Sequence, residues 1–373
     1  MSLALNRPDL LADILRAFGV AGSMTAAESF GSGHINEIYR LSVRGPSGRR
    51  RYLLRRINTR VFRRPELVVR NTVRVTRHLA ERLAAENLPD AHRRVLTLLP
   101  TPAGESCHWD EEGVPWCLFP FIEGTVSVNE VGEARQAFDA ARVVGHFQRL
   151  TADLAPADFP ETIPGFHDGP GRLAALEQAV AADAAGRVAT AAPEIGFARE
   201  HAELCHRLTA RLADGTLPVR VTHNDTKLNN VLLDAATGEG LCLTDLDTVM
   251  PGTVLYDYGD MVRSFTPSFA EDARDAADGV RVPVFEALTR GYVAEARAVL
   301  TPGETAHLLL GAEFMVWIIG IRFLTDYLAG DIYFRVQRPD HNLDRCRTQF
   351  RLLAELQRLR PRLSSILSAA LEG

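Results

Sequence analysis

Cysteine is scarce in this sequence of 373 residues, and no two cysteines form a Cys-x-x-Cys pair. The five cysteines are scattered along the chain, at positions 107, 117, 205, 242 and 346. An odd and scattered set supports neither a zinc site nor a disulfide framework. We therefore expect a reducing compartment and predict a cytoplasmic protein.

The chain also lacks a large excess of charge and a long apolar run. Its net charge is −5, whereas a general nucleic-acid binder usually carries a basic excess, so we expect no nucleic-acid partner. The most apolar stretch, Leu308–Ile321, contains Glu313 and is too short to span a bilayer. We expect it to be a buried helix, and we expect no membrane partner. The oligomeric state stays open.

Two regions of different character are present, with no internal repeat. Gly and Pro residues separate β-rich runs in the first third of the chain, which indicates an antiparallel sheet. Strands are expected at residues 26–30, 35–43, 51–57, 94–99, 105–109 and 114–122, with a helix beginning near Pro65. Helical patterns dominate after Gly124, apart from a β-like interval at 219–249. The prediction is an α+β protein with an N-terminal lobe at 1–120 and a larger, mainly helical C-terminal lobe at 121–373.

The β-like interval contains a dense group of polar residues between apolar strands. Asp225 is followed by Lys227 and Asn230, and Asp245 comes fifteen residues after Asn230, at the end of another β-type run. Phosphoryl transfer needs such groups, because its catalysis consists mostly of positioning and charge compensation. Asp225 suits the attacking hydroxyl, Lys227 the γ-phosphate, and Asn230 with Asp245 a hard metal ion such as Mg²⁺.

This segment resembles the catalytic loop of protein kinases, through His223, Asp225, Lys227 and Asn230, and Asp245 resembles the metal-binding Asp of their D-F-G segment. Its form is closer to the aminoglycoside phosphotransferase and choline kinase families. The resemblance implies a bilobal, protein-kinase-like fold and the use of ATP and Mg²⁺. It also implies that His223 and the later Asp257 support the loop structurally.

Further stretches resemble the N-acetylhexosamine 1-kinase family within this group. They are residues 33–36, 56–58, 163–167, 222–227, 245–252, 320–331, Tyr333 and 341–343. This resemblance implies a small-molecule acceptor, a sugar phosphorylated on its anomeric hydroxyl, with Asp225 as the base.

The N-terminal lobe contains the residues expected to hold the nucleotide. Gly31 and Gly33 lie between two strand patterns, where backbone N–H groups can approach phosphates. The lobe lacks the third-strand lysine that holds the phosphates in protein kinases. The resemblance implies that an arginine of that strand takes this role, as in similar kinases. Neighbouring strand residues face opposite ways, and of Arg55 and Arg56 we predict Arg56. Phe119 and Phe121 belong to the connector whose backbone is expected to bind the adenine edge.

The acceptor is expected to face Asp225 from the helical lobe. Its candidate binding residues are His34, His167, Arg322, Asp326, Asp331 and Tyr333. Arg322 and Asp326 share a helix face, so an ordinary surface ion pair is the competing interpretation. Other acceptors, such as an aminoglycoside, an amino alcohol or another sugar, stay open. A nucleotide-binding pseudokinase scaffold is the alternative of another class, supported only by the missing lysine.

Overall fold

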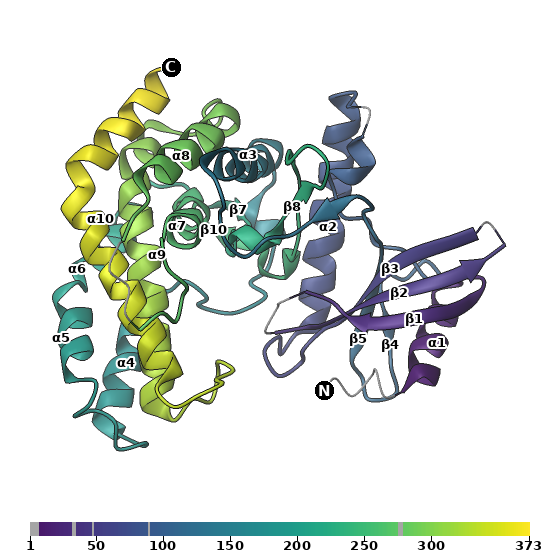
Figure 1. Ribbon diagram of the computed structural model, residues 1–373, viewed down its shortest axis with the longest axis horizontal. Coiled ribbons are helices and arrows are strands. Elements are labelled where there is room, and N and C mark those ends of the chain that lie inside the picture. The colour runs from purple at the N-terminus through teal and green to yellow at the C-terminus, as the bar shows by residue number, and fades with distance from the viewer. Residues whose placement is uncertain (1–6, 32–34, 47, 89, 275–278) are drawn as a thin grey trace.

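The computed structural model describes residues 7–31, 35–46, 48–88, 90–274 and 279–373. It consists of a small lobe built on an antiparallel sheet and a larger lobe built mostly of helices, which lie side by side along the longest axis (Figure 1). The predicted α+β, bilobal, kinase-like fold class is confirmed. Gly33 and His34 lie outside the described residues.

The sheet of the N-terminal lobe has five antiparallel strands in the order β1-β2-β3-β5-β4. Their bounds are β1 Ser23–Ser29, β2 Glu37–Gly45, β3 Gly48–Arg56, β4 His108–Trp109 and β5 Pro115–Pro120. The β2–β3 hairpin closes at Gly48, whose φ of 102° favours glycine. The strand predicted at 94–99 is wrong, since only an isolated bridge from Leu99 to Leu118 forms there.

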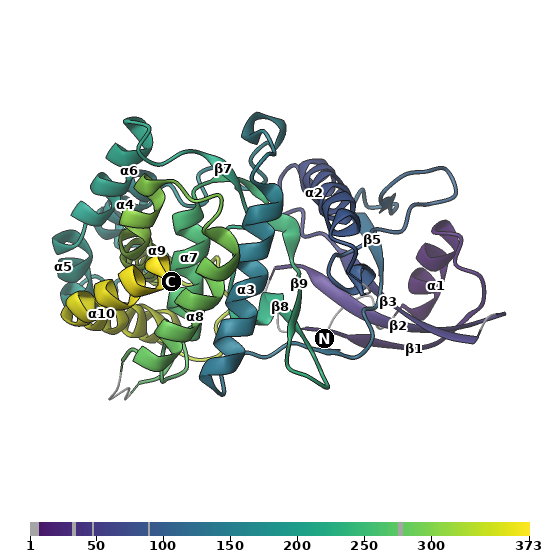
Figure 2. The ribbon, with the colours of Figure 1, turned by 90° about the horizontal axis from the view of Figure 1, so that it is seen from above.

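Helices cover both faces of this sheet, because its strands alternate apolar residues on each side. Helix α1 (Pro8–Ala17) packs Leu11 and Ile14 in one cluster with Trp116 and Leu118 of β5. Helix α2 (Pro65–Ala85) packs Val68 and Val69 in another cluster, which contains the intervening β5 residues Cys117 and Phe119. The α2 side of the sheet is therefore the side that faces the helical lobe (Figure 2).

The C-terminal lobe is organised around one long apolar helix. Its helices are α3 Ala134–Thr151, α4 Gly169–Ala182, α5 Ala192–Glu200, α6 Glu203–Ala213, α7 Val254–Phe265, α8 Val282–Ala296, α9 Pro302–Ala329 and α10 His341–Glu372. Helix α9 has 28 residues, enough by length and composition alone to cross a membrane, but 83% of its most apolar window is buried within the protein. It is thus the core helix that the sequence predicted, and it begins with a capping box at Thr301 and Glu304.

Five short strands carry the polar segments toward the smaller lobe. β6 (Thr125–Val126), β8 (Val231–Asp234) and β9 (Gly240–Leu243) form one antiparallel sheet, and β7 (Arg220–Thr222) pairs with β10 (Met250–Gly252). The loop from β7 to β8 and the segment from β9 to β10 consequently lie side by side, on the side of the larger lobe that is nearest α2 (Figure 1). These two segments contain all four residues assigned to the chemistry.

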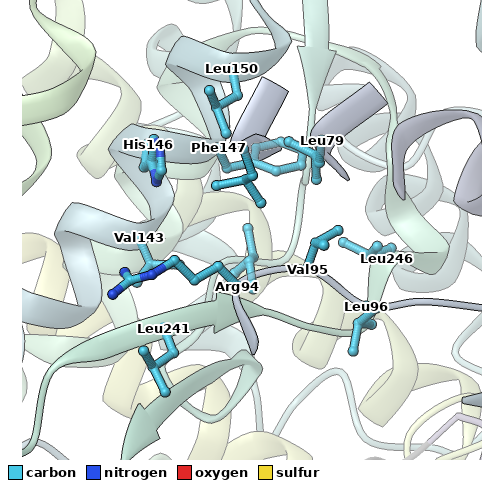
Figure 3. A pocket seen from close by; sticks show the side chains of 12 residues that line it. Leu79, Arg94, Val95, Leu96, Val143, His146, Phe147, Leu150, Leu241 and Leu246 are labelled. Atoms are coloured by element: carbon cyan, nitrogen blue, oxygen red, sulfur yellow. The ribbon is translucent and has the colours of Figure 1, made fainter. Parts of the chain in front are cut away.

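A small enclosed cavity lies where α2 meets α3, with Leu79, Phe147 and Leu150 on one side and Arg94 at another (Figure 3). Its volume is about 20 Å³, room for about one water molecule. This space is far too small for a nucleotide. It marks the apolar packing that holds α2 against the helical lobe.

One buried polar side chain also fixes α2 to the C-terminal lobe. Asn71 is fully buried, and its Nδ2 donates to the carbonyl oxygens of Pro160 and Val249, each at 2.9 Å. Both acceptors belong to the larger lobe, so this contact ties the lobes together.

We expect Asn71→Ala to lower the free energy of unfolding by about 1–3 kcal/mol, because two buried carbonyl groups lose their donor. Urea denaturation followed by circular dichroism measures the loss. Arg77→Ala, an exposed change on the same helix, is the control and should stay close to the parent protein. Equal stability of Asn71→Ala and the control would contradict this contact's contribution.

Candidate active site

Asp225, Lys227 and Asn230 meet in the loop that follows β7. Lys227 Nζ donates to Asp225 Oδ2 at 2.8 Å, and Asn230 Nδ2 donates to the same oxygen at 3.0 Å and to the Asp225 carbonyl at 2.8 Å. The other carboxylate oxygen, Oδ1, accepts no hydrogen bond from the part of the chain that the structure describes. Asp225 therefore presents one held oxygen and one available oxygen.

The charges of this loop reinforce one another. Although burial favours the neutral acid, Lys227 lowers the pKa of Asp225, which stays ionised at neutral pH. Burial likewise opposes the charge of Lys227, but Asp225 and Asp245 together raise its pKa. Lys227 is the single lysine of the chain, and it lies between two carboxylates that keep it protonated.

A buried carboxylate holds the backbone of the loop. Asp257, at the start of α7, is fully buried and accepts the backbone N–H of His223 at 3.1 Å and of Asn224 at 2.7 Å. Gln148 of α3 donates to it at 3.0 Å. Asn224 adopts a left-handed φ of 65°, which asparagine tolerates better than most residues.

His223 connects the loop to the second polar segment. Its Nε2 donates to the Thr244 carbonyl at 2.8 Å, and its Nδ1 accepts the Asp225 N–H at 3.3 Å, so the imidazole is neutral. The Thr244 N–H in turn donates to the Asn230 carbonyl at 2.7 Å. These contacts place Asp245, the next residue, beside Asn230.

Asp245 has an unusual backbone and a free carboxylate. It follows β9 with a left-handed φ of 57°, and its half-buried side chain accepts no hydrogen bond from any described residue. The Oδ1 of Asn230 is free in the same sense. Together they offer two hard oxygens. No group of three or more His, Cys, Asp or Glu residues suited to a metal exists among the described residues, so an ion here would need further ligands from a bound phosphate.

On the third strand, Arg55 rather than the predicted Arg56 lies on the α2 face of the sheet, toward the larger lobe. Arg56 lies over the Trp116 ring and pairs with the exposed Glu112 at 3.2 Å. Arg55 is buried on the α2 face, where it pairs with Asp247. Strand alternation was the right rule, but the outward face could be identified only from the packing of Trp116 against α1.

Phe119 lies on the α2 side of β5, and Phe121 follows directly after the end of that strand. The Arg55 guanidinium lies 5.2 Å from the centre of the Phe119 ring, and Phe121 contacts Phe30 edge-on at 5.7 Å. Gly31 follows Phe30 with a φ of 82°, a conformation that glycine adopts readily. The predicted phosphate loop, which includes Gly31, therefore starts beside the connector that contains Phe121.

In the larger lobe, aromatic rings surround Arg322, whose charge also interacts with that of Asp225. The guanidinium of Arg322 lies 4.9 Å from the ring centre of Phe166, 5.9 Å from that of Tyr333 and 5.7 Å from that of Phe334. Burial lowers the pKa of Arg322 to about 10, so it stays charged at neutral pH. Within the described ranges it forms no ion pair. The charge is therefore available to a ligand.

The sequence matches the phosphotransferase enzyme family over residues 26–298, more than half of the chain. The chain belongs to this family. It is accordingly a small-molecule phosphotransferase, an enzyme that transfers phosphate to a hydroxyl group.

Solved structures similar to this phosphotransferase support the fold. A microcompartment-associated aminopropanol kinase matches with a TM-score of 0.60 at 15% identity, covering 95% of this chain and 98% of the other. An aminoglycoside phosphotransferase from Alicyclobacillus acidocaldarius matches with a TM-score of 0.60 at 13% identity, covering 97% and 96%. A spectinomycin phosphotransferase in complex with ADP and spectinomycin matches with a TM-score of 0.55 at 10% identity, covering 97% of each chain. At such identities the likeness concerns the fold alone.

In this phosphotransferase, Asp326 and Asp331 do not offer free carboxylates to an acceptor. Asp326 accepts the backbone N–H groups of the loop after α9, those of Ile332 at 2.9 Å, Tyr333 at 2.7 Å and Phe334 at 2.9 Å. It does not pair with Arg322, one turn earlier on the helix.

Asp331 is bound by two other donors. Arg187 contacts one of its oxygens at 2.6 Å and Asn342 the other at 2.9 Å. Both aspartates thus shape the loop that carries Tyr333. The sequence placed them at the acceptor because it could not reveal these backbone and side-chain partners.

His167 supports the phosphotransferase loop from behind. It is buried, its Nε2 donates to the Asn224 carbonyl at 3.0 Å, and its ring lies 4.8 Å from that of Tyr256. Burial lowers its pKa to about 3, so it is neutral at ordinary pH. Phe166, its neighbour, is the residue that contacts Arg322, and the sequence gave no signal for it beyond its loop.

We expect Asp326→Ala to free the loop at 331–334, since three backbone N–H groups lose their shared acceptor. Limited proteolysis with thermolysin, which cuts beside apolar residues, should cleave near the exposed Ile332 at least ten times faster. Glu355→Ala is the control, because the one ion pair of Glu355 among the described residues is with Arg358 of its own helix. Unchanged cleavage in Asp326→Ala would show that other contacts hold the loop.

Proposed function

We propose that this phosphotransferase uses ATP and Mg²⁺ to phosphorylate the anomeric hydroxyl of an N-acetylhexosamine. The observation that carries the proposal is the Asp225 carboxylate. Lys227 and Asn230 hold one of its oxygens, and the other accepts nothing from the described residues. An acceptor hydroxyl fits that free oxygen. ADP in the similar spectinomycin phosphotransferase supports an adenine nucleotide as the donor.

The acceptor class follows from the charged groups around Arg322 and from their partners. A polycationic aminoglycoside requires free carboxylates, but Asp326 and Asp331 are bound within the protein. A choline headgroup requires empty aromatic faces, but the guanidinium of Arg322 already lies among them. An uncharged sugar meets neither obstacle, and its hydroxyl and amide oxygens are natural acceptors for Arg322 and for the Tyr333 hydroxyl.

The reaction would proceed at the free oxygen of Asp225. The anomeric oxygen forms a bond to the γ-phosphorus while the bond from that phosphorus to the bridging oxygen breaks, and ADP leaves with the electron pair. The proton of the sugar hydroxyl passes to Asp225. Lys227 lies beside this carboxylate, where its positive charge compensates the transferred oxygens.

The free oxygens of Asn230 and Asp245 fit a magnesium ion that completes its coordination with phosphates and water. Bound there, the ion would neutralise phosphate charge. Arg55 would serve the same nucleotide from the N-terminal lobe, since its Nε and Nη2 are buried without a hydrogen-bond partner in the residues described.

We expect Asp225→Asn to reduce turnover by about 10²–10⁴-fold, the usual contribution of a positioned general base. The amide keeps the size of the side chain but cannot take the proton. Coupled detection of ADP release measures turnover, and circular dichroism checks the fold. Near-parental turnover would remove Asp225 from the chemistry.

A panel of acceptors tests the substrate class. With Mg²⁺ and ATP, N-acetylglucosamine or N-acetylgalactosamine should release ADP and yield an acid-labile sugar 1-phosphate. Activity on kanamycin or choline, with none on an N-acetylhexosamine, would reverse the choice of acceptor. Absence of turnover with every acceptor would favour a nucleotide-binding scaffold.

Removing the metal should abolish turnover. Excess EDTA should stop ADP release, and added Mg²⁺ should restore it. We expect Asp245→Ala to lower turnover strongly and to raise the Mg²⁺ concentration needed for half-maximal rate. Full activity in EDTA would refute the assignment of Asn230 and Asp245.

A further inference from the structure

One of the places where the two lobes meet is a short segment of the larger lobe, which runs from Asp247 to Val249. Three polar side chains of the smaller lobe converge on it. Arg55 contacts Asp247 Oδ1, Asn36 Nδ2 contacts Asp247 Oδ2, and Asn71 donates to the Val249 carbonyl at 2.9 Å. The sequence did not single out Asp247.

Asp247 is the only carboxylate paired with Arg55 among the described residues, and the pair is secluded from water. The exposed fraction of the side chain is 3% for Asp247 and 6% for Arg55. A buried arginine without a counterion would be strongly unfavourable, so Arg55 depends on this aspartate. Thr162 adds a hydrogen bond to the Asp247 carbonyl at 2.7 Å, which fixes the backbone beneath the pair.

No glutamate of α2 reaches Arg55. Glu66 lies at the start of the helix and pairs with Arg64 at 2.9 Å. Glu81 is exposed, near the other end, and forms no ion pair with a described residue. Helix α2 itself is fixed to the larger lobe by Asn71. The arginine is therefore held by the segment that follows Asp245, and not by the helix.

Asp247 satisfies only part of the Arg55 guanidinium, so a phosphate could accept hydrogen bonds from its remaining donors. One nitrogen, Nη1, is engaged by Asp247, while Nε and Nη2 have no hydrogen-bond partner in the described part of the chain. The Phe119 ring lies beneath the group, 5.2 Å away. Asn36 is braced as well, because its Oδ1 accepts the Asn58 N–H at 2.9 Å.

We propose that Asp247 is a positioning residue of the transfer reaction. It orients the Arg55 guanidinium toward the nucleotide phosphates. It also links the position of the smaller lobe to the segment that contains Asp245. Helix α2 contributes Asn71 to the same segment, but it supplies no counterion to Arg55. The inference rests on the proposed use of ATP. It adds that the counterion of Arg55 comes from the C-terminal lobe and not from a glutamate of α2.

Binding of Mg²⁺-ADP, measured by isothermal titration calorimetry, tests the proposal without an acceptor. We expect Asp247→Asn to raise the dissociation constant at least tenfold, because Arg55 loses its counterion and is no longer held in one orientation. Arg55→Gln should have an effect of similar size. The double variant should bind no more weakly than Arg55→Gln alone, since Asp247 acts through Arg55.

Matched variants separate positioning from general damage. Glu66→Gln and Glu81→Gln should leave the dissociation constant within twofold. Glu313→Gln removes another buried carboxylate, which pairs with Arg360 between α9 and α10, and it should lower stability without changing nucleotide affinity.

Three results would overturn the proposal. One is tighter ADP binding by Asp247→Asn, which would mean that the pair competes with phosphate. Another is additive losses in the double variant, which would indicate a merely structural role. The third is weaker binding in Glu81→Gln or Glu66→Gln. If no variant and no parent protein binds Mg²⁺-ADP, the proposed use of ATP fails instead.

Discussion

The buried carboxylate of Asp257 is the group on which the active site depends most. It accepts the backbone N–H groups of His223 and Asn224 and so fixes the turn that presents Asp225. Burial raises the pKa of Asp257, and the donors around it work against that shift. Without this acceptor, two buried N–H groups would be unsatisfied, and the left-handed backbone at Asn224 would lose its support.

The same logic extends outward from the loop. His223 connects it to Thr244, and Thr244 contacts Asn230, so the loop and the segment of Asp245 are held as one unit. Asp247 then connects that unit to the smaller lobe through Arg55. A chain of backbone and side-chain hydrogen bonds thus joins the core of the helical lobe to strand β3 of the smaller lobe.

The sequence revealed the architecture and the loop well. Hairpin turns, apolar periodicity and the spacing of Asp225, Asn230 and Asp245 are local signals, and the family match and the fold agree with the class they predicted. The strand expected at 94–99 failed because its residues find only one bridging partner, at Leu118.

The predictions for the site differ from the structure where long-range contacts decide how a side chain lies. Arg55 and Arg56 are neighbours in the chain, and only the packing of α1 and α2 on opposite faces of the sheet decides which one faces the cleft. Asp326 looked available because its partners are backbone groups six to eight residues later. Asp247 and Phe166 lie in stretches that carry the family resemblance, but no role was predicted for either, because their contacts come from elements that are distant in the chain.

Lys227 has a further consequence as the chain's single lysine. Acylation, carbamylation or any conjugation that targets a side-chain amine can occur at no other side chain of this sequence. Each such event would replace the cation beside Asp225 with a neutral, larger group. Any reagent that modifies a lysine side chain of this protein therefore acts at the proposed catalytic loop and at no other side chain.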